Sequence, residues 1–332
     1  MLCSLIRETD ISFQCDTRRK LTRSVRFVLS VRIHGRTVRL LIDRIAFVYP
    51  ISEIDFTPSI WALHHLHERG LATYPRSRIT PHSEFVRMRM VLRRNRGIVA
   101  SVYRVYGQYG IKIDWSPSSI TPDTHPFFAD LIGSLIVGGV DHLLDSGFVR
   151  YFEAALDVPG EVDQNYVIAY PRIARSCIYY NAIDESQTAY LGARNGRYSF
   201  ALYDKAKQLR QRHARFIRGE LLRLEHRNRE RHAFAAMAAL PNPFSELLVA
   251  DLRSARSLSS LPDWHRFLDA CEDDGAQRAL QRYSSHRRRK FKRLLLQARA
   301  SWFDANPLWA NWPNLLEQFS ANSLGRFCGD WE

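Results

Sequence analysis

Alternating apolar and polar residues in the first two thirds of the chain constrain its fold most. Residues 24–33 carry apolar side chains at every second position, which predicts a strand with one buried face. These side chains are Val25, Phe27, Leu29, Val31 and Ile33. The sequence His34-Gly35-Arg36 predicts a turn, and the apolar run 37–49 predicts the second strand of a β-hairpin.

The same patterns predict many more strands before residue 230 and mostly helices after it. Strands are expected at 85–92, 98–106, 111–115, 148–158, 166–170, 176–181, 197–204 and 220–226, and helices at 58–70, 126–144 and 205–216. Beyond Arg229 we expect helices at 230–240, 243–251, 264–273 and 276–300. Strands followed by helices indicate an α+β fold, in which a mostly antiparallel central sheet carries helices on one face and a helical C-terminal region follows.

The composition shifts suggest three parts of the chain. An N-terminal arm is expected over 1–23, an α+β body over 24–240, and a helical C-terminal region over 241–332. The boundary between the last two is expected at Pro241-Asn242-Pro243, because two prolines so close together interrupt regular structure.

The balance of charges favours nucleic acid as the partner. The chain has 48 Lys and Arg against 34 Asp and Glu, a formal net charge of +14. Only six of the 48 are lysines, and the planar guanidinium of the 42 arginines suits phosphate oxygens. A GC-rich genome would explain arginine in place of lysine, but not the surplus of cations over acids. We therefore expect nucleic acid as a partner.

Other classes of site find no support. The five cysteines are scattered and form no Cys-x-x-Cys pair, so we expect reduced thiols rather than a zinc site or a disulfide framework. No Gly-rich nucleotide loop of the Walker type is present. The most apolar stretch, 127–140, is interrupted by Asp130 and is too short to span a bilayer. The start lacks the apolar core of a signal peptide, so a cytoplasmic protein without a membrane segment is expected.

Several short motifs occur in a suggestive order along the chain. Residues 188–207 read as a strand, a turn with Gly192 and a second strand ending in Tyr-Asp-Lys. The motifs are Ile111–Pro117, Arg150–Asp157, Tyr190–Arg194, Tyr203–Lys205 and Arg223–Glu225. Together they resemble those of the replication initiation factor family of rolling-circle plasmids and phages, over roughly residues 40–230. The chain departs from the family pattern at Glu153, where an Asp is usual and one extra residue follows Arg150, and at Ser116, where an Asn is usual.

The resemblance implies an endonuclease whose body, 24–240, binds origin DNA as duplex and as single strand. It nicks one strand of the origin and keeps it as a covalent phosphotyrosine. A tyrosine can attack a phosphodiester and leave a 3′-hydroxyl beside a 5′-phosphotyrosyl bond. The free phenol has a pKa of about 10 and is a poor nucleophile, so a divalent cation is needed to polarise the phosphate. We predict Tyr203 as the nucleophile, with Tyr190 next and then Tyr179 and Tyr180. Lys205 is predicted to pair with the phosphate.

Carboxylates on adjacent strands are expected to hold the cation, as Mg²⁺ or Mn²⁺. Glu153 and Asp157 point the same way along one strand, with small Ala155 between them. Glu225 comes from the later strand of the family pattern. We therefore predict Glu153, Asp157 and Glu225 as metal ligands, with Asp204 as a further acid in a strand context.

Alternatives remain open from the sequence alone. A conjugative relaxase would use similar chemistry on a transfer origin, and a DNA-binding regulator could keep the scaffold without the catalysis. An RNA-binding protein would also use the arginines and aromatics. His65-Leu66-His67 matches the metal motif of other nickases, but that motif needs a strand and residues 61–70 predict a helix. We therefore interpret these histidines as a surface cluster. A host helicase and a second copy of the chain are further candidate partners.

The basic segment 286–299 predicts a DNA-binding helix, and Arg194 and Arg197 are expected to assist. An apolar stripe of Phe291, Leu294, Leu295 and Ala298 lies beside its charges. The predicted phosphate contacts are Arg287, Arg288, Arg289, Lys290 and Arg293. Changing four of these to Gln should weaken DNA binding and flatten its salt dependence, because each phosphate contact adds roughly one unit to the log–log slope. An unchanged slope in a salt titration would contradict the assignment.

Overall fold

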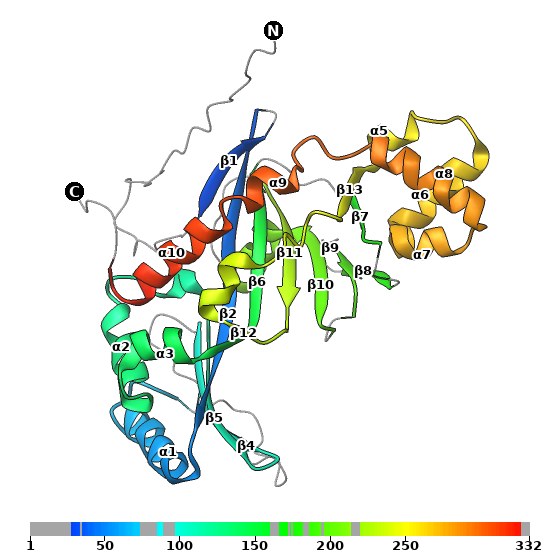
Figure 1. Ribbon diagram of the computed structural model, residues 1–332. Helices are drawn as coiled ribbons and strands as arrows, with labels where there is room; N and C mark the ends of the chain where they lie inside the picture. The colour runs from blue at the N-terminus through cyan, green and yellow to red at the C-terminus, as the bar shows by residue number, and fades with distance from the viewer. Residues whose placement is uncertain are drawn as a thin grey trace.

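A computed structural model describes most of the chain. The described residues are 28–33, 35–73, 85–88, 97–159, 166–171, 173, 175–181, 186–193, 196–213 and 220–326. Within these ranges lie one 11-stranded sheet, a separate two-stranded sheet and the helices that cover them (Figure 1). The predicted N-terminal arm, 1–23, lies outside the described residues.

The large sheet is antiparallel in every pairing between its described strands. Its order is β3-β4-β5-β2-β6-β11-β10-β9-β8, with β1 added to β2 and β12 added to β6. The strands are β1 (Leu29–Ile33), β2 (Arg36–Ile51), β3 (Phe85–Met88), β4 (Ile98–Val105), β5 (Gln108–Trp115), β6 (Phe148–Pro159), β8 (Ser176–Asn181), β9 (Ser186–Leu191), β10 (Tyr198–Asp204), β11 (Leu221–Asn228) and β12 (His232–Ala233). This sheet confirms the α+β fold predicted from the sequence.

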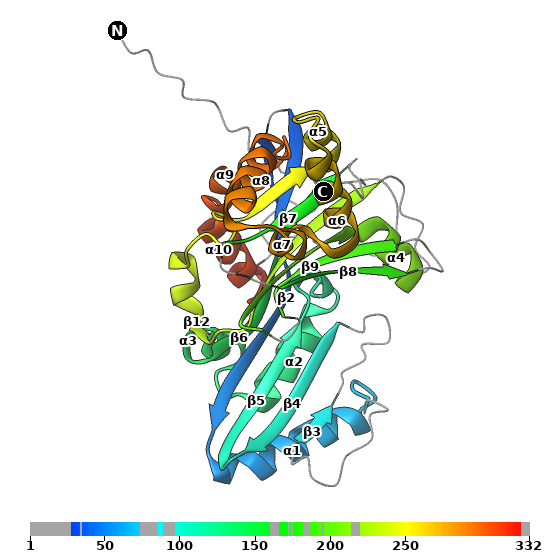
Figure 2. The same cartoon turned by 90° about the vertical axis from the view of Figure 1, so that its right-hand side faces the viewer.

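Helices lie on one side of this sheet and form a separate group near its end. The helices are α1 (Glu53–Glu68), α2 (His125–Leu135), α3 (Gly139–Ser146), α4 (Lys205–His213), α5 (Leu252–Arg256), α6 (Pro262–Asp274), α7 (Ala276–Gln281), α8 (Ser285–Gln297), α9 (Ala305–Trp309) and α10 (Trp312–Ser323). Figure 1 shows α2, α3 and α10 on one side of the sheet. The group α5–α8 lies beside the two-stranded sheet of β7 (Tyr166–Ala169) and β13 (Leu248–Asp251), as Figure 2 also shows.

Two hydrophobic cores follow from this arrangement. The larger core lies between the sheet and its covering helices, where Phe152 and Leu156 of β6 pack with Trp312 and Phe319 of α10. The smaller core joins Trp264, Phe267 and other residues of α5–α8 to β7 and β13. The last helices of the predicted C-terminal region thus contribute to the core of the body. The predicted boundary at Pro241 stays a prediction.

The structure corrects several predicted helices. The expected helix 126–144 is two helices, bent by 67°. Gly138 and Gly139 between them have φ of +88° and +64°, a left-handed backbone that glycine adopts without the steric cost of a Cβ. The expected helix 243–251 ends instead in the short strand β13, because an apolar run of this length fits a buried strand equally well. The expected helix 276–300 is divided into α7 and α8.

One further property concerns membranes. Across the described ranges no helix alone has the length and apolar composition needed to cross a bilayer. Only α2 and α3 taken together as a bent pair pass that test.

The packing of α10 against the sheet generates a prediction about stability. Trp312 is fully buried, stacks on Trp309 with ring centroids 4.5 Å apart, and donates a hydrogen bond to the carbonyl of Met237 at 2.8 Å. Trp312→Ala should lower the free energy of unfolding by about 3–5 kcal/mol, because it leaves a large cavity in the main core.

Denaturant unfolding measures this change, and Trp61→Ala is the matched control. Trp61 is 65% exposed, so its loss should change the free energy of unfolding by less than about 0.5 kcal/mol. Equal effects of the two substitutions would show that α10 does not belong to the main core.

Candidate metal and tyrosine site

The face of the sheet opposite the main core carries the polar residues of the candidate site. Along β6 the side chains of Phe152, Ala154 and Leu156 enter the core, so Glu153 and Asp157 share the other face. On β11, Glu225 lies on that face opposite Ala155. The antiparallel register also places Arg223 of β11 opposite Asp157, and Arg227 of β11 opposite Glu153.

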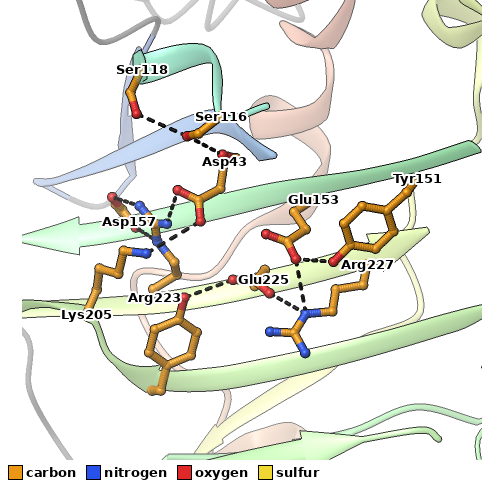
Figure 3. Close-up of polar contacts among 11 residues, drawn as sticks. Asp43, Ser116, Ser118, Tyr151, Glu153, Asp157, Lys205, Arg223, Glu225 and Arg227 are labelled. Carbon is orange, nitrogen blue, oxygen red and sulfur yellow. Dashed lines mark hydrogen bonds and ion pairs between the residues drawn. The ribbon is translucent and has the colours of Figure 1, made fainter. Parts of the chain in front are cut away.

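A β-bulge in β2 brings a residue to this face that the sequence did not predict. Ile42 pairs with Ala154 and Arg44 pairs with Glu153, which leaves Asp43 as the extra residue. A bulge of this kind re-aims side chains. As a result, Asp43 turns to the cluster in Figure 3, while the neighbouring Arg44 forms two hydrogen bonds with Asp114, at 2.7 and 2.8 Å.

Ser116 supports the bulge from the neighbouring strand. Its hydroxyl donates to the backbone carbonyl of Asp43 at 2.6 Å and lies 3.1 Å from the hydroxyl of Ser118 (Figure 3). Ser116 stands in the motif that follows β5, where the resembling family carries an Asn. The hydrogen bond gives this position a local role, which is to hold the backbone from which Asp43 projects.

Asp43, Glu153 and Glu225 form a cluster of three acids. Each offers a carboxylate oxygen, and these oxygens all lie within 4.8 Å of one another. Glu153 and Glu225 are buried and Asp43 is half-buried. Three carboxylates converging in this way are a donor set that suits Mg²⁺ or Mn²⁺.

Asp157, the remaining predicted ligand, has a different partner. Arg223 Nε and Nη2 donate to its two carboxylate oxygens at 2.5 and 2.7 Å. The structure therefore brings two of the three predicted ligands together and puts Asp43 beside them, while Asp157 forms a buried ion pair. Its role as a ligand stays a prediction.

The pKa values of two acids in the cluster, Glu153 and Asp43, are shifted in opposite directions. Burial, followed by the nearby charge of Glu225, raises the pKa of Glu153 to about 7. Burial would also raise the pKa of Asp43, but the charges of Arg223 and Lys205 outweigh it and lower that pKa to about 2. Glu153 is thus only partly ionised at neutral pH, as expected where acids repel one another without a cation between them.

Tyr203, the predicted nucleophile, lies in contact with this cluster. It is 7% exposed, and its hydroxyl donates to Glu225 Oε2 at 2.8 Å. Burial and then the charge of Glu225 raise the pKa of Tyr203 well above its ordinary value. The strand ends at Asp204 and α4 begins at Lys205, in the order that the sequence predicted.

Lys205 and Arg227 surround the acids with positive charge. Lys205 Nζ lies 3.4 Å from Asp43 Oδ2 and 5.8 Å from the ring centroid of Tyr203. Burial lowers the pKa of Lys205, and the charge of Arg223 lowers it further. Arg227 contacts both Glu225 and Glu153, the latter at 3.6 Å (Figure 3).

Two other tyrosines share this face. The hydroxyl of Tyr151 donates a hydrogen bond to Glu153. The sequence did not suggest this contact, because Tyr151 is not among the predicted nucleophiles. Tyr190, the first competitor of Tyr203, lies opposite Ala201 in the register of β9 and β10. The guanidinium carbon of Arg227 lies 5.6 Å from the ring centroid of Tyr190.

The remaining predicted residues lie away from the acids or outside the described ranges. Arg194 and the side chain of Tyr180 are outside the described residues, and Arg197, 73% exposed at its side chain, pairs with Glu230. On α8 the apolar stripe is buried at Phe291, Leu295 and Ala298, as predicted. The predicted cations of this helix are exposed except for Lys290, which is half-buried. Arg287 already pairs with Asp263 at 2.6 Å.

The histidine pair lies on a helix, as the sequence indicated. Both residues are on α1, where His65 is exposed and His67 is half-buried. The Nδ1 atom of His67 lies 2.9 Å from the carbonyl oxygen of Ala72. The two side chains thus have the separate surroundings expected for residues two apart on a helix.

Comparisons with known proteins find similarity in structure and none in sequence. No protein-family model matches the chain, and no curated protein matches its sequence. A solved structure of a rolling circle replication initiator protein from Geobacillus stearothermophilus aligns with a TM-score of 0.32 and 12% identity, over 61% of this chain and 77% of the other. A TM-score this low does not establish a shared fold or function.

The raised pKa of Glu153 predicts how a metal ion should stabilise the protein. An unfolded glutamate ionises near 4.5 and folded Glu153 near 7, so the folded state binds more protons between these values. Its contribution to the free energy of unfolding therefore falls as the pH rises from about 4.5 to about 7. A cation competes with this proton, so the rise in Tm caused by Mn²⁺ should be larger at pH 8 than at pH 6.

Thermal unfolding with and without Mn²⁺ at several pH values measures this effect. In Glu153→Gln the difference between pH 6 and pH 8 should disappear. Asp43→Asn and Asp157→Asn then tell whether Asp43 or Asp157 joins Glu153 and Glu225 as a ligand. Only the substitution that removes a ligand should abolish the rise in Tm caused by Mn²⁺. A wild-type rise in Tm that is independent of pH would contradict the participation of Glu153.

Proposed function

We propose that this chain binds DNA and nicks one strand through a covalent 5′-phosphotyrosine, with a divalent cation held by Asp43, Glu153 and Glu225. One observation carries the proposal. The hydroxyl of Tyr203 is hydrogen-bonded at 2.8 Å to Glu225, which belongs to the cluster of three acids. A tyrosine and a metal-type donor set in direct contact are the two parts that this chemistry needs.

The reaction assigns each group a step. The phenolic oxygen of Tyr203 attacks phosphorus as its proton passes to Glu225, and the bond from phosphorus to the 3′ oxygen breaks. The 3′ oxygen takes a proton and becomes a free hydroxyl, while the 5′ phosphate stays on the tyrosine. A bound cation supplies charge neutralisation at the phosphate oxygens. Lys205, 5.8 Å from the ring centroid of Tyr203, is proposed to stabilise the same charge.

DNA as the substrate is supported by charge. The chain carries a formal net charge of +14, mostly as arginine, and α8 presents a row of exposed cations in addition to those at the site. A rolling-circle replication origin is the proposed target, on the resemblance of the motifs. A host helicase and a homodimer stay predictions.

The non-catalytic alternative has its own observation in favour. Tyr203 is 7% exposed, and Asp43 is paired with both Arg223 and Lys205 rather than left as a free ligand. A DNA-binding regulator that retained the scaffold would tolerate both features. Catalysis requires that binding of DNA and a cation expose Tyr203 and draw Asp43 from its partners.

Substituting the tyrosine separates the two functions. Tyr203→Phe removes one oxygen and should leave folding and DNA binding intact. The substrate is a supercoiled plasmid that carries the DNA beside the gene. The rate at which this plasmid is nicked should fall by on the order of a thousandfold or more, because the nucleophile is lost. Mass spectrometry of trapped adducts should place the 5′-phosphate on the peptide with Tyr203.

Tyr190→Phe and Tyr151→Phe are the matched controls, since both tyrosines lie on the same face. Nicking that survives in Tyr203→Phe but disappears in Tyr190→Phe would transfer the role to Tyr190. A wild-type protein that binds the plasmid but forms no nick with Mg²⁺ or Mn²⁺ would establish the regulator. Wild-type nicking that persists in excess EDTA would remove the metal from the proposal.

A further inference from the structure

A cavity of about 610 Å³ lies where β8 and β9 meet the helix α7. Its lining includes Tyr179 and Tyr190 from the two strands and Arg278 from the helix. Helices α6 and α7 contact β8, so the cavity lies at the junction of the large sheet and the α5–α8 group (Figure 2). The proposed nicking chemistry leaves this cavity without a role.

The lining combines aromatic rings with positive charge. The rings of Tyr179 and Tyr190 meet edge to face with centroids 5.3 Å apart, and Tyr179 is 61% exposed. Arg175, which is exposed, and Arg278 lie at the same cavity, and none of its described lining residues is acidic. Arg278 also lies 3.8 Å from the half-buried Asp274, but its own side chain is 63% exposed and can reach another anion. Tyrosine rings beside arginines are the groups that bind unstacked bases and their phosphates.

The junction that shapes the cavity is held by hydrogen bonds. The Ser176 hydroxyl of β8 accepts from the backbone N–H of Arg278 at 3.0 Å and donates to the carbonyl of Asp274 at 3.1 Å. A Cβ built on Gly275 would lie 2.9 Å from the same hydroxyl, so a larger residue there would push the helices from the strand. These contacts fix the backbone of Arg278 at the cavity.

Neighbouring residues of the sheet link the cavity to the acidic cluster. Thr188, which lines the cavity, lies opposite Tyr203 in the register of β9 and β10. Tyr190 also lines the cavity, and Arg227, which lies over its ring, contacts Glu225. A strand of DNA whose phosphate reaches Tyr203 would therefore carry a neighbouring nucleotide across Tyr190 to the cavity.

We infer that this cavity binds one unpaired base of the single DNA strand, next to the phosphate at the acidic cluster. The inference rests on the proposed function for the position of the strand, and it adds the state of the substrate, which must be locally unpaired. A base within a duplex stacks on its neighbours and cannot place its face on Tyr179. The site thus selects single-stranded or melted DNA, with Arg175 and Arg278 at the flanking phosphates.

Binding measured in EDTA tests this inference separately from nicking. Fluorescence anisotropy should show roughly tenfold weaker binding of a single-stranded oligonucleotide to Tyr179→Ala, because one stacking platform is lost. Binding of duplex DNA should be unchanged. Tyr106→Ala is the matched control, since Tyr106 is fully exposed on the turn between β4 and β5 and should leave both affinities unchanged. Arg278→Gln, compared with Arg266→Gln on α6, tests the charge in the same way.

Cross-linking of the wild-type protein gives a second measurement that needs no substitution. An oligonucleotide containing 5-iododeoxyuridine should form its photoadduct on Tyr179 or Tyr190. The inference would be overturned if Tyr179→Ala weakened the binding of single-stranded and duplex DNA equally, or weakened only the binding of RNA. Photoadducts confined to other residues would also overturn it. Because these measurements detect binding and photoadducts rather than nicks, their outcomes do not depend on whether Tyr203 is the nucleophile.

Discussion

The buried guanidinium of Arg223 is the interaction on which the rest of the site depends. It is 3% exposed, pairs with both oxygens of Asp157 and lies 2.5 Å from Asp43 Oδ1, so it joins three adjacent strands. A charge this deep is tolerated only when opposite charges surround it, and removing one partner of such a group typically costs about 3–5 kcal/mol. The ion pairs therefore hold the registers of β2, β6 and β11, and with them the positions of Glu153 and Glu225.

The division of the sheet into two faces gives these charges their place. One face is closed by apolar side chains and by α9 and α10, which contribute Trp309 and Trp312 from near the end of the chain. The other face collects the tyrosines, acids and cations from β2, β6, β9, β10 and β11. On this face the contacts of a side chain are set by hydrogen bonds and charges rather than by apolar packing. Tyr151 and Tyr203 accordingly each donate a hydrogen bond to an acid.

Sequence reasoning predicted the parts of this arrangement that alternation controls. The strands of the body, the shared face of Glu153 and Asp157, and the position of Tyr203 at a strand end all follow from a period of two. Asp43 was missed because it is a bulge residue. Its signal was present, since the apolar alternation of Val38, Leu40 and Ile42 resumes at Ile45 and Phe47, one residue out of phase.

Asp157 shows a different limit, because a strand pattern cannot tell a metal ligand from the partner of a buried arginine. The C-terminal helices were missed in part because short apolar runs such as 248–251 suit a strand as well as a helix.

The balance of charge at the site explains why a cation and DNA belong together there. The acids Asp43, Glu153, Asp157 and Glu225 are matched by Lys205, Arg223 and Arg227, which leaves one excess negative charge when all are ionised. Partial protonation of Glu153 reduces that excess near neutral pH, because burial raises the pKa of its carboxyl group. A phosphate brings a further negative charge beside carboxylates that already repel one another. Only a cation at the three acids reverses the local sign, so binding of the metal and approach of the phosphate should each favour the other.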